Sequence, residues 1–223
     1  MRDPLLVVCA LAPEVWALRG GDWSGACGGP AVLARTGMGR RRARRSAGAL
    51  LAAGGYGALV VAGFGAAVGP GTEPGDVIVA DAVRDSDGGF HPLESAPALV
   101  KALEGHGLTV HTGLHHTADH VVRGAERHAL HAAGALAVDM EAAAVLAARA
   151  ELRPELPAAV LRIVVDTPER ELIRPGTLPA GIRAWRALRS AVPALIEWHR
   201  QATAPAPSTE LHPQPSTLPQ EAS

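Results

Sequence analysis

Short apolar runs that alternate with longer helical segments are the feature that most constrains this fold. The runs at 5–11 (LLVVCAL), 58–63 (ALVVAG) and 158–166 (AAVLRIVVD) are apolar on both faces over most of their length. Strands of this kind are typical of parallel sheets, which helices cover on both sides. The chain is therefore predicted to be a single-domain α/β protein with a mostly parallel, twisted central sheet flanked by helices.

The predicted elements span nearly the whole chain. Strands are expected at 5–11, 31–36, 58–63, 76–84, 108–117, 135–140 and 158–166, and helices at 40–53, 96–106, 125–134, 141–152 and 181–200. Residues 202–223 are dominated by Pro, Ser and Thr and show no apolar period, which predicts a disordered tail behind a domain at 1–201.

Composition excludes several classes of function. A net charge of −1 and 3% aromatic residues argue against a nucleic-acid partner. Two cysteines, Cys9 and Cys27, are too few for a disulfide framework and fit a reducing cytoplasm. The N-terminal apolar run is far shorter than the roughly 20 residues that span a bilayer, so no membrane span is predicted.

Glycine-rich turns follow two predicted strands, in TGMGRRRARR and AGFGAAVGPG. Neither matches the dinucleotide or phosphate-loop patterns. The arginines at Arg40–Arg45 have two interpretations: a solvated helix face that partly pairs with acids, or a phosphate-binding or nucleic-acid-binding group. We favour the solvated face.

Three carboxylates fall near the ends of predicted strands: Glu14, Glu141 and Asp166. Each alone is typical of a helix cap or first turn. Because ligands bind beyond the carboxyl ends of strands in such sheets, three together predict an active-site cleft.

Five segments, in order, resemble the nucleoside phosphorylase and nucleosidase superfamily in its hydrolase branch, which includes methylthioadenosine/S-adenosylhomocysteine nucleosidase. They are CALAPEVWAL, TGMGRRRA, VVAGFGAAVGPGTEPGDVIVAD, AVDMEAAAV and LRIVVDTPE, between about Leu5 and Arg200. VDMEAAAV and RIVVDTPERELIRPGTLP are most similar to the hopanoid-associated phosphorylase-like proteins. That narrower resemblance implies adenosylhopane as substrate and adenine as product.

The resemblance implies catalytic roles for two acids. Glu14 matches the glutamate that activates the attacking water, and Asp166 matches the aspartate that protonates the purine at N7. Such an acid needs a setting that keeps it protonated near neutrality. Arg162 matches an arginine that supports the acid.

The resemblance also implies substrate-binding residues. Glu141 matches the glutamate that binds the ribose hydroxyls, and Met140 matches a methionine that packs on the sugar, although ordinary core packing explains a methionine nearly as well. Gly63 matches the turn glycine near sugar and base.

Several positions depart from the family pattern. Val165 replaces a serine before the acid, and Phe64 replaces a serine after the turn glycine. Val121 and Val122 occupy the place of the residues around adenine, so a stacking phenylalanine is missing and Phe64 is the candidate replacement. These departures suit a substrate unlike methylthioadenosine, such as one with a lipid group on the 5′ side.

Water is favoured over phosphate as the nucleophile. Phosphorylases of this superfamily have a phosphate-binding arginine where this chain has Val61, and Glu14 is present as in the hydrolases. A phosphorylase and a non-catalytic nucleoside-binding protein stay as alternatives. The resemblance further implies a homo-oligomer that acts on a small-molecule nucleoside without a cofactor.

The histidines His115, His116 and His120 have the look of a metal-binding group. His116 and His120 would share a face only in a helix, and a strand end is predicted there. Loop or surface histidines are therefore expected, with no metal site.

Overall fold

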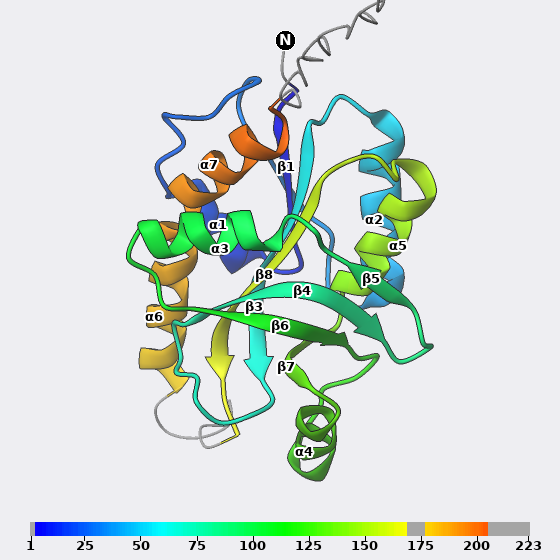
Figure 1. The fold of residues 1–223 in the computed structure, drawn as a ribbon, viewed down its shortest axis with the longest axis vertical. Coiled ribbons are helices and arrows are strands. Elements are labelled where there is room, and N and C mark those ends of the chain that lie inside the picture. Colours follow the sequence, from blue (N-terminus) through cyan, green and yellow to red (C-terminus); the bar gives the residue numbers. More distant parts are fainter. Residues whose placement is uncertain (1–2, 169–176, 205–223) are drawn as a thin grey trace, which may run out of the picture.

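The computed structural model describes residues 3–168 and 177–204. Its strands are β1 (Leu5–Cys9), β2 (Val32–Arg35), β3 (Ala58–Ala67), β4 (Val77–Asp85), β5 (Phe90–Pro92), β6 (Val110–Thr117), β7 (Ala135–Asp139) and β8 (Ala158–Asp166). Its helices are α1 (Ala12–Arg19), α2 (Arg40–Ala53), α3 (Ala96–Gly105), α4 (Gly124–Ala132), α5 (Ala142–Leu152), α6 (Thr177–Ser190) and α7 (Val192–Ala202). Helices lie on both sides of the sheet (Figure 1).

The sheet is mixed rather than mostly parallel. Its order is β2-β1-β3-β7-β6-β4-β5, and β8 pairs with both β3 and β4. Strand β3 is parallel to β1 and β8, whereas β4 is antiparallel to β8 and β7 is antiparallel to β3. The pairings from β3 through β7, β6, β4 and β8 return to β3, so these five strands close into a ring. The predicted α/β class is confirmed, and the sheet direction is corrected.

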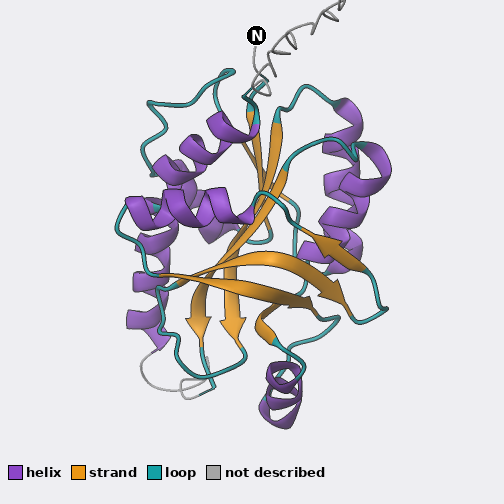
Figure 2. Ribbon diagram, in the orientation of Figure 1, coloured by secondary structure: helices purple, strands orange, loops and turns teal. Residues whose placement is uncertain are grey.

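Alternating side chains of the central strands pack into two hydrophobic cores, one on each face of the sheet. In β3, Val60 and Ala62 belong to the core under α1, α3, α6 and α7, whereas Leu59 and Val61 belong to the core under α2 and α5. Figure 2 shows these two helix groups on opposite sides of the strands. Each buried aliphatic side chain contributes about 1.5–3 kcal/mol. Burial on both faces explains why the strands read as continuous apolar runs.

Three elements differ from the sequence prediction. The first strand ends at Cys9, and α1 starts at Ala12 with Pro13 in its first turn, where a missing amide costs little. The expected closing helix is two helices, because a second helix starts at Val192 with Ala191 as its N-cap and Pro193 in its first turn. Strand β5 is short and pairs only with β4. The predicted tail at 202–223 lies almost wholly outside the described residues.

The topology brings distant segments to one end of the sheet. Strand β3 lies between β1 and β8 and is parallel to both, so the carboxyl ends of the three strands share an edge. Figure 1 shows β3 and β8 pointing to the end of the molecule where α4 lies. Within the described ranges, no helix has the length and apolar character that a bilayer crossing needs.

Candidate functional site

A cavity of about 230 Å³ lies at this edge of the sheet. It contains most of the side chains that the sequence singles out, which come from β3, α1, β8 and the segments around β7 and α4: Glu14, Phe64, Val121, Val122, Met140, Glu141 and Asp166. Gly63 and Arg162 lie directly behind the wall, next to Glu14. The structure therefore brings the predicted acids together in one cavity.

Glu14 is held rigidly at the start of α1. Its Oε2 accepts a hydrogen bond from the Leu11 amide at 2.7 Å, and its Oε1 accepts one from the Phe64 amide at 2.7 Å. The residue is 2% exposed. Burial raises the pKa of Glu14, although Arg162 and the backbone donors oppose the shift. A buried carboxylate with a raised pKa is a suitable proton acceptor for a water molecule.

Gly63 is required by its closeness to Glu14. A Cβ atom at this position would lie 2.5 Å from Oε1 of Glu14 and 3.1 Å from Nη1 of Arg162. Any side chain here would push the glutamate out of place. This contact gives a physical reason for the glycine that the sequence pattern picked out.

Glu141 lies between β7 and α5 and reaches the start of α2. Its Oε1 accepts a hydrogen bond from the Gly39 amide at 2.7 Å. Gly39 has a φ of +89°, a conformation that favours glycine. Burial and then the neighbouring Asp139 raise the pKa of Glu141, and Arg162 opposes them. The amide at the start of α2 is thus used by a carboxylate of the chain itself.

Asp139 is a buried residue of the site that sequence reasoning missed. Its Oδ2 accepts hydrogen bonds from Nε of Arg162 at 2.9 Å and from Nη2 of the same side chain. Its Oδ1 accepts from Thr117 Oγ1 at 2.8 Å. Burial alone would raise the pKa of Asp139, but Arg162 and then His115 hold it far below its usual value. The signal was available, because Asp139 ends a strand as Asp166 does.

Arg162 therefore neutralises Asp139, rather than supporting Asp166 as the resemblance implied. The arginine is 2% exposed. Because its hydrogen bonds go to Asp139, it acts on Glu14 and Glu141 only through its charge. Both of these acids line the cavity.

Asp166 contacts a different arginine, Arg127 of α4. Nη2 of Arg127 donates to Oδ2 of Asp166 at 2.9 Å, and both side chains are buried and line the cavity. Sequence reasoning missed Arg127, since an arginine in the middle of a short polar helix gives no signal of burial.

The apolar lining divides between the interior and the mouth of the cavity. Val122 is 3% exposed and packs with Ala118 and Val138, whereas Val121 is 60% exposed. Phe64 and Met140 also line the cavity. A ligand in this cavity would therefore contact apolar side chains both in the interior and at the mouth.

Two of the three histidines at 115, 116 and 120 lie in different environments. His115 is fully buried next to Asp139, so the expectation of a surface or loop residue is wrong for it. His120 is exposed between Asp119 and Glu126. Over residues 3–168 and 177–204, no cluster of three or more potential metal ligands occurs.

Two members of the arginine cluster are paired with acids, as expected. Arg40 contacts Asp85 and Asp87, and Arg44 contacts Glu151. None of the arginines at 40–45 is among the described residues that line the cavity. The cluster is thus in part a paired helix face.

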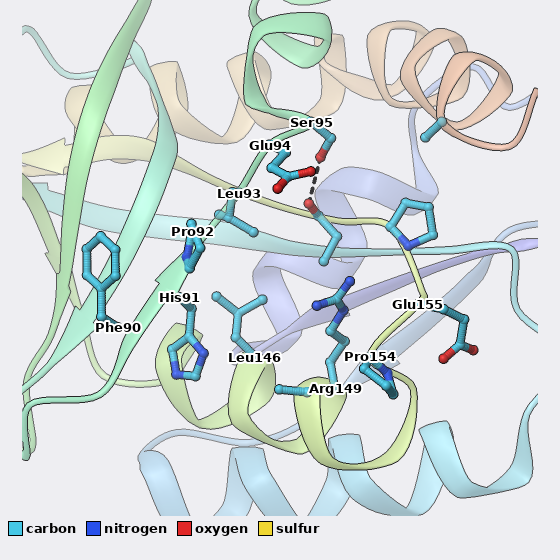
Figure 3. A pocket seen from close by; sticks show the side chains of 14 residues that line it. Phe90, His91, Pro92, Leu93, Glu94, Ser95, Leu146, Arg149, Pro154 and Glu155 are labelled. Carbon is cyan, nitrogen blue, oxygen red and sulfur yellow. Dashed lines mark hydrogen bonds between the residues drawn. The ribbon is translucent and has the colours of Figure 1, made fainter. Parts of the chain in front are cut away.

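A larger cavity of about 750 Å³ lies between β5, α5 and the start of β8 (Figure 3). Arg149 at its centre is held by its own chain, because Nε donates to the Leu156 carbonyl at 2.7 Å. Glu94 and Glu155 lie on separate sides of this cavity. Its lining contains none of the predicted site residues, so the smaller cavity is the better candidate.

Comparisons with known proteins identify the family and the fold. The model of the phosphorylase superfamily matches residues 22–178. A search of the curated proteins returns no match. Among solved structures, the 5′-methylthioadenosine/S-adenosylhomocysteine nucleosidase of Neisseria meningitidis, in complex with methylthio-immucillin-A, has a TM-score of 0.71 at 19% identity and covers 88% of this chain and 98% of its own.

Two further structures have the same fold. The corresponding nucleosidase of Campylobacter jejuni has a TM-score of 0.74 at 15% identity, over 89% of this chain and 99% of its own. The futalosine hydrolase of Helicobacter pylori has a TM-score of 0.71 at 16% identity, over 88% of this chain and 97% of its own.

Proposed function

The chain belongs to the phosphorylase superfamily, and from this premise we propose that it is an N-ribosyl hydrolase that splits the bond between a purine base and its ribose with water. The observation that carries the proposal is the cavity itself. It gathers the three acids that the sequence singles out, Glu14, Glu141 and Asp166, in one small space that Asp139 also lines. Buried acids in a shared cavity are costly and mark a functional site.

Each acid has a distinct role in this proposal. Glu14 accepts a proton from the attacking water, for which its raised pKa suits it. Glu141 accepts hydrogen bonds from the ribose hydroxyls, with Met140 packing on the sugar. Asp166, which also lines the cavity, donates a proton to N7 of the leaving base. The protonated base then leaves as a neutral molecule.

Water is the proposed nucleophile for two reasons. The amide of Gly39 at the start of α2 donates to Glu141, so this helix terminus already holds an anion. Arg40 and Arg44 are engaged with acids outside the cavity. The structurally similar nucleosidases and futalosine hydrolase, whose names describe hydrolytic enzymes, also favour water.

The apolar mouth suggests what the substrate carries beyond its sugar. Leu11, Met38 and Val121 line the cavity and are 37%, 57% and 60% exposed. An apolar 5′ substituent would cover them, which favours a lipid-linked nucleoside such as adenosylhopane in hopanoid biosynthesis. A homo-oligomer and a cytoplasmic location stay predictions.

Release of free base tests the proposal. The purified protein is mixed with adenosine, inosine, uridine and adenosylhopane, and free base is followed by chromatography. We expect a purine to be released, and Asp166→Asn should lower the turnover by orders of magnitude. If no nucleoside loses its base although nucleosides bind tightly, the protein is a non-catalytic binder and the proposal fails.

A further inference from the structure

Exposed apolar side chains lie at the mouth of the cavity that holds the predicted acids. Leu11, Met38 and Val121 line this cavity and are 37%, 57% and 60% exposed. They come from three separate segments, which are the turn after β1, the turn before α2 and the loop before α4. Large apolar side chains that gather at one exposed place mark a surface that binds a partner.

Trp16 extends this surface along α1. It is 61% exposed, whereas the other three tryptophans are half-buried or buried. It follows Leu11 by five residues, which is about 7.5 Å along the axis of α1. Tryptophan favours the boundary between lipid headgroups and acyl chains, because its ring is apolar and its N–H group is polar. We call Leu11, Trp16, Met38 and Val121 the apolar rim.

The arginine-rich start of α2 lies beside the apolar rim. Arg40 follows Met38 by two residues, and its charge interacts with that of Asp119, in the loop that carries Val121. The next four arginines of α2 are all exposed: Arg41, Arg42, Arg44 and Arg45. Positive charge and exposed apolar surface therefore adjoin each other.

Much of this positive charge is unmatched within the described ranges. Arg40 and Arg44 contact acids, but Arg41, Arg42 and Arg45 form no ion pair with a described acid. Arg41 and Arg45 lie one helical turn apart, where like charges repel, and the first turn of α2 contains no acid. Cations at a helix N-terminus also oppose the helix dipole. An anionic partner would offset the stability that this arrangement loses.

The combination of charge and apolar surface selects among partners. A nucleic acid would match the arginines but would leave Trp16 and Met38 without an apolar contact. A second copy of the chain, related by a two-fold axis at this face, would bring the arginines of α2 close to the same arginines of its partner. An anionic membrane satisfies both features, because apolar side chains enter the headgroup region while arginines contact the headgroups.

We propose that the apolar rim and the exposed arginines of α2 dock the protein on an anionic phospholipid surface, with the mouth of the cavity against the membrane. The inference rests on the proposed function and deepens it. A nucleoside with a lipid group on its 5′ side would be held among the acyl chains, so its ribose would lie at the level of the headgroups. Docking at the mouth would let that ribose enter the cavity without exposing the lipid to water.

Flotation with lipid vesicles tests the docking without requiring turnover. The wild type should bind vesicles of phosphatidylglycerol and phosphatidylcholine in equal parts, and binding to phosphatidylcholine alone should be at least tenfold weaker. Arg41→Gln/Arg45→Gln should bind the anionic vesicles about 30-fold more weakly, which is about fivefold for each arginine. Lys101→Gln/Arg200→Gln is the matched control, because it removes the same charge from exposed positions outside the cavity lining.

Tryptophan fluorescence gives a second readout. The emission of the wild type should shift to shorter wavelength on anionic vesicles as Trp16 leaves water. Trp16→Ser should show no such shift and should bind roughly tenfold more weakly, since the apolar contact is lost. Leu152→Ser is the matched control, because Leu152 is 42% exposed at the end of α5 and should bind as the wild type does. Thermal unfolding shows whether the variants are folded.

Several results would overturn the docking surface. They are equal binding of the wild type to both kinds of vesicle, binding to neither, and unchanged binding by folded Arg41→Gln/Arg45→Gln. Binding of duplex DNA without binding of vesicles would do the same, as would a dimer in sedimentation velocity that Trp16→Ser dissociates. Base release without vesicle binding would overturn the docking surface and leave the hydrolase. Arginine-dependent vesicle binding without base release from any nucleoside would support the docking surface and overturn the hydrolase.

Discussion

The two walls of the cavity use arginine in opposite ways. On the side that we propose binds the sugar, Arg162 is neutralised by Asp139. On the side that we propose binds the base, Arg127 is neutralised by Asp166. Burial raises the pKa of Glu14 and of Glu141 on the first side, and Arg162 only partly opposes the shift. The second commits one oxygen of Asp166 to the arginine.

The comparison shows that the state of a carboxylate depends on whether the neighbouring arginine is already paired with another acid. Arg162 lies close enough to act on Glu14 by charge, but its hydrogen bonds belong to Asp139. Glu14 therefore has a raised pKa, as the proposed general base requires. Asp166 has no such intermediary among the described residues, so it is paired directly.

Removal of the proposed general base, Glu14, should have the largest effect on activity. Glu14→Gln should lower kcat/KM by about 10²- to 10⁴-fold, the usual contribution of a general base. Glu104→Gln is the matched control, since Glu104 is exposed on α3. Steady-state kinetics on the best nucleoside measures both variants. A Glu14→Gln enzyme with nearly full activity would remove Glu14 from the mechanism.

Loss of Asp139, the acid that neutralises Arg162, should have the next largest effect, which is on stability. Asp139→Asn leaves a buried arginine without its partner and should lower the free energy of unfolding by about 3–5 kcal/mol. Asp87→Asn breaks the exposed contact with Arg40 and should cost at most about 1 kcal/mol. Urea unfolding followed by circular dichroism compares the two. Equal losses would contradict the difference between buried and exposed pairs.

The same pair predicts how stability depends on pH. The pKa of Asp139 is lowered in the folded protein, so its contribution is complete above the ordinary value of about 3.9 and is lost as the pH falls below it. Urea unfolding of the wild type and Asp139→Asn should therefore differ most near neutrality and converge in acid. If the difference in the free energy of unfolding widened in acid, Asp139 would not have a lowered pKa in the folded protein.

A methyl group at Gly63 should disturb only the sugar-side wall. Gly63→Ala places Cβ 2.5 Å from Oε1 of Glu14, and displacement of a catalytic group by such a contact can cost about 10²-fold in kcat. Gly48→Ala in α2, whose nearest neighbour would be Leu152 at 4.0 Å, should leave activity unchanged. Measurement of kcat for both variants tests this prediction. A fully active Gly63→Ala would show that Glu14 need not be fixed there.

The smallest effect is a shift in the pH profile. Glu14 must be ionised to accept a proton, and burial raises its pKa, so kcat/KM should fall tenfold per pH unit from a point above the ordinary value of about 4.3. A measured pH profile that stays flat down to pH 4 would exclude Glu14 as the base with a raised pKa.

Sequence reasoning could predict the elements whose pattern is local. The buried strands β1, β3 and β8 can be predicted because both faces pack under helices. The acids near the ends of β1, β7 and β8 can be located from the strand ends. The antiparallel pairing of β4 with β8 could not be predicted, since strand direction depends on long-range closure of the ring. Arg127 was missed for the same reason, because its burial arises only where α4 meets the end of β8.

The most direct test of the account is the identity of the sugar product in the presence and absence of phosphate. The account predicts that free ribose, or its 5′-substituted form, appears with the purine at the same rate in phosphate-free and phosphate-containing buffer. Base release that requires phosphate and yields a ribose 1-phosphate would contradict it, because the acids around Glu14 would then not be activating water.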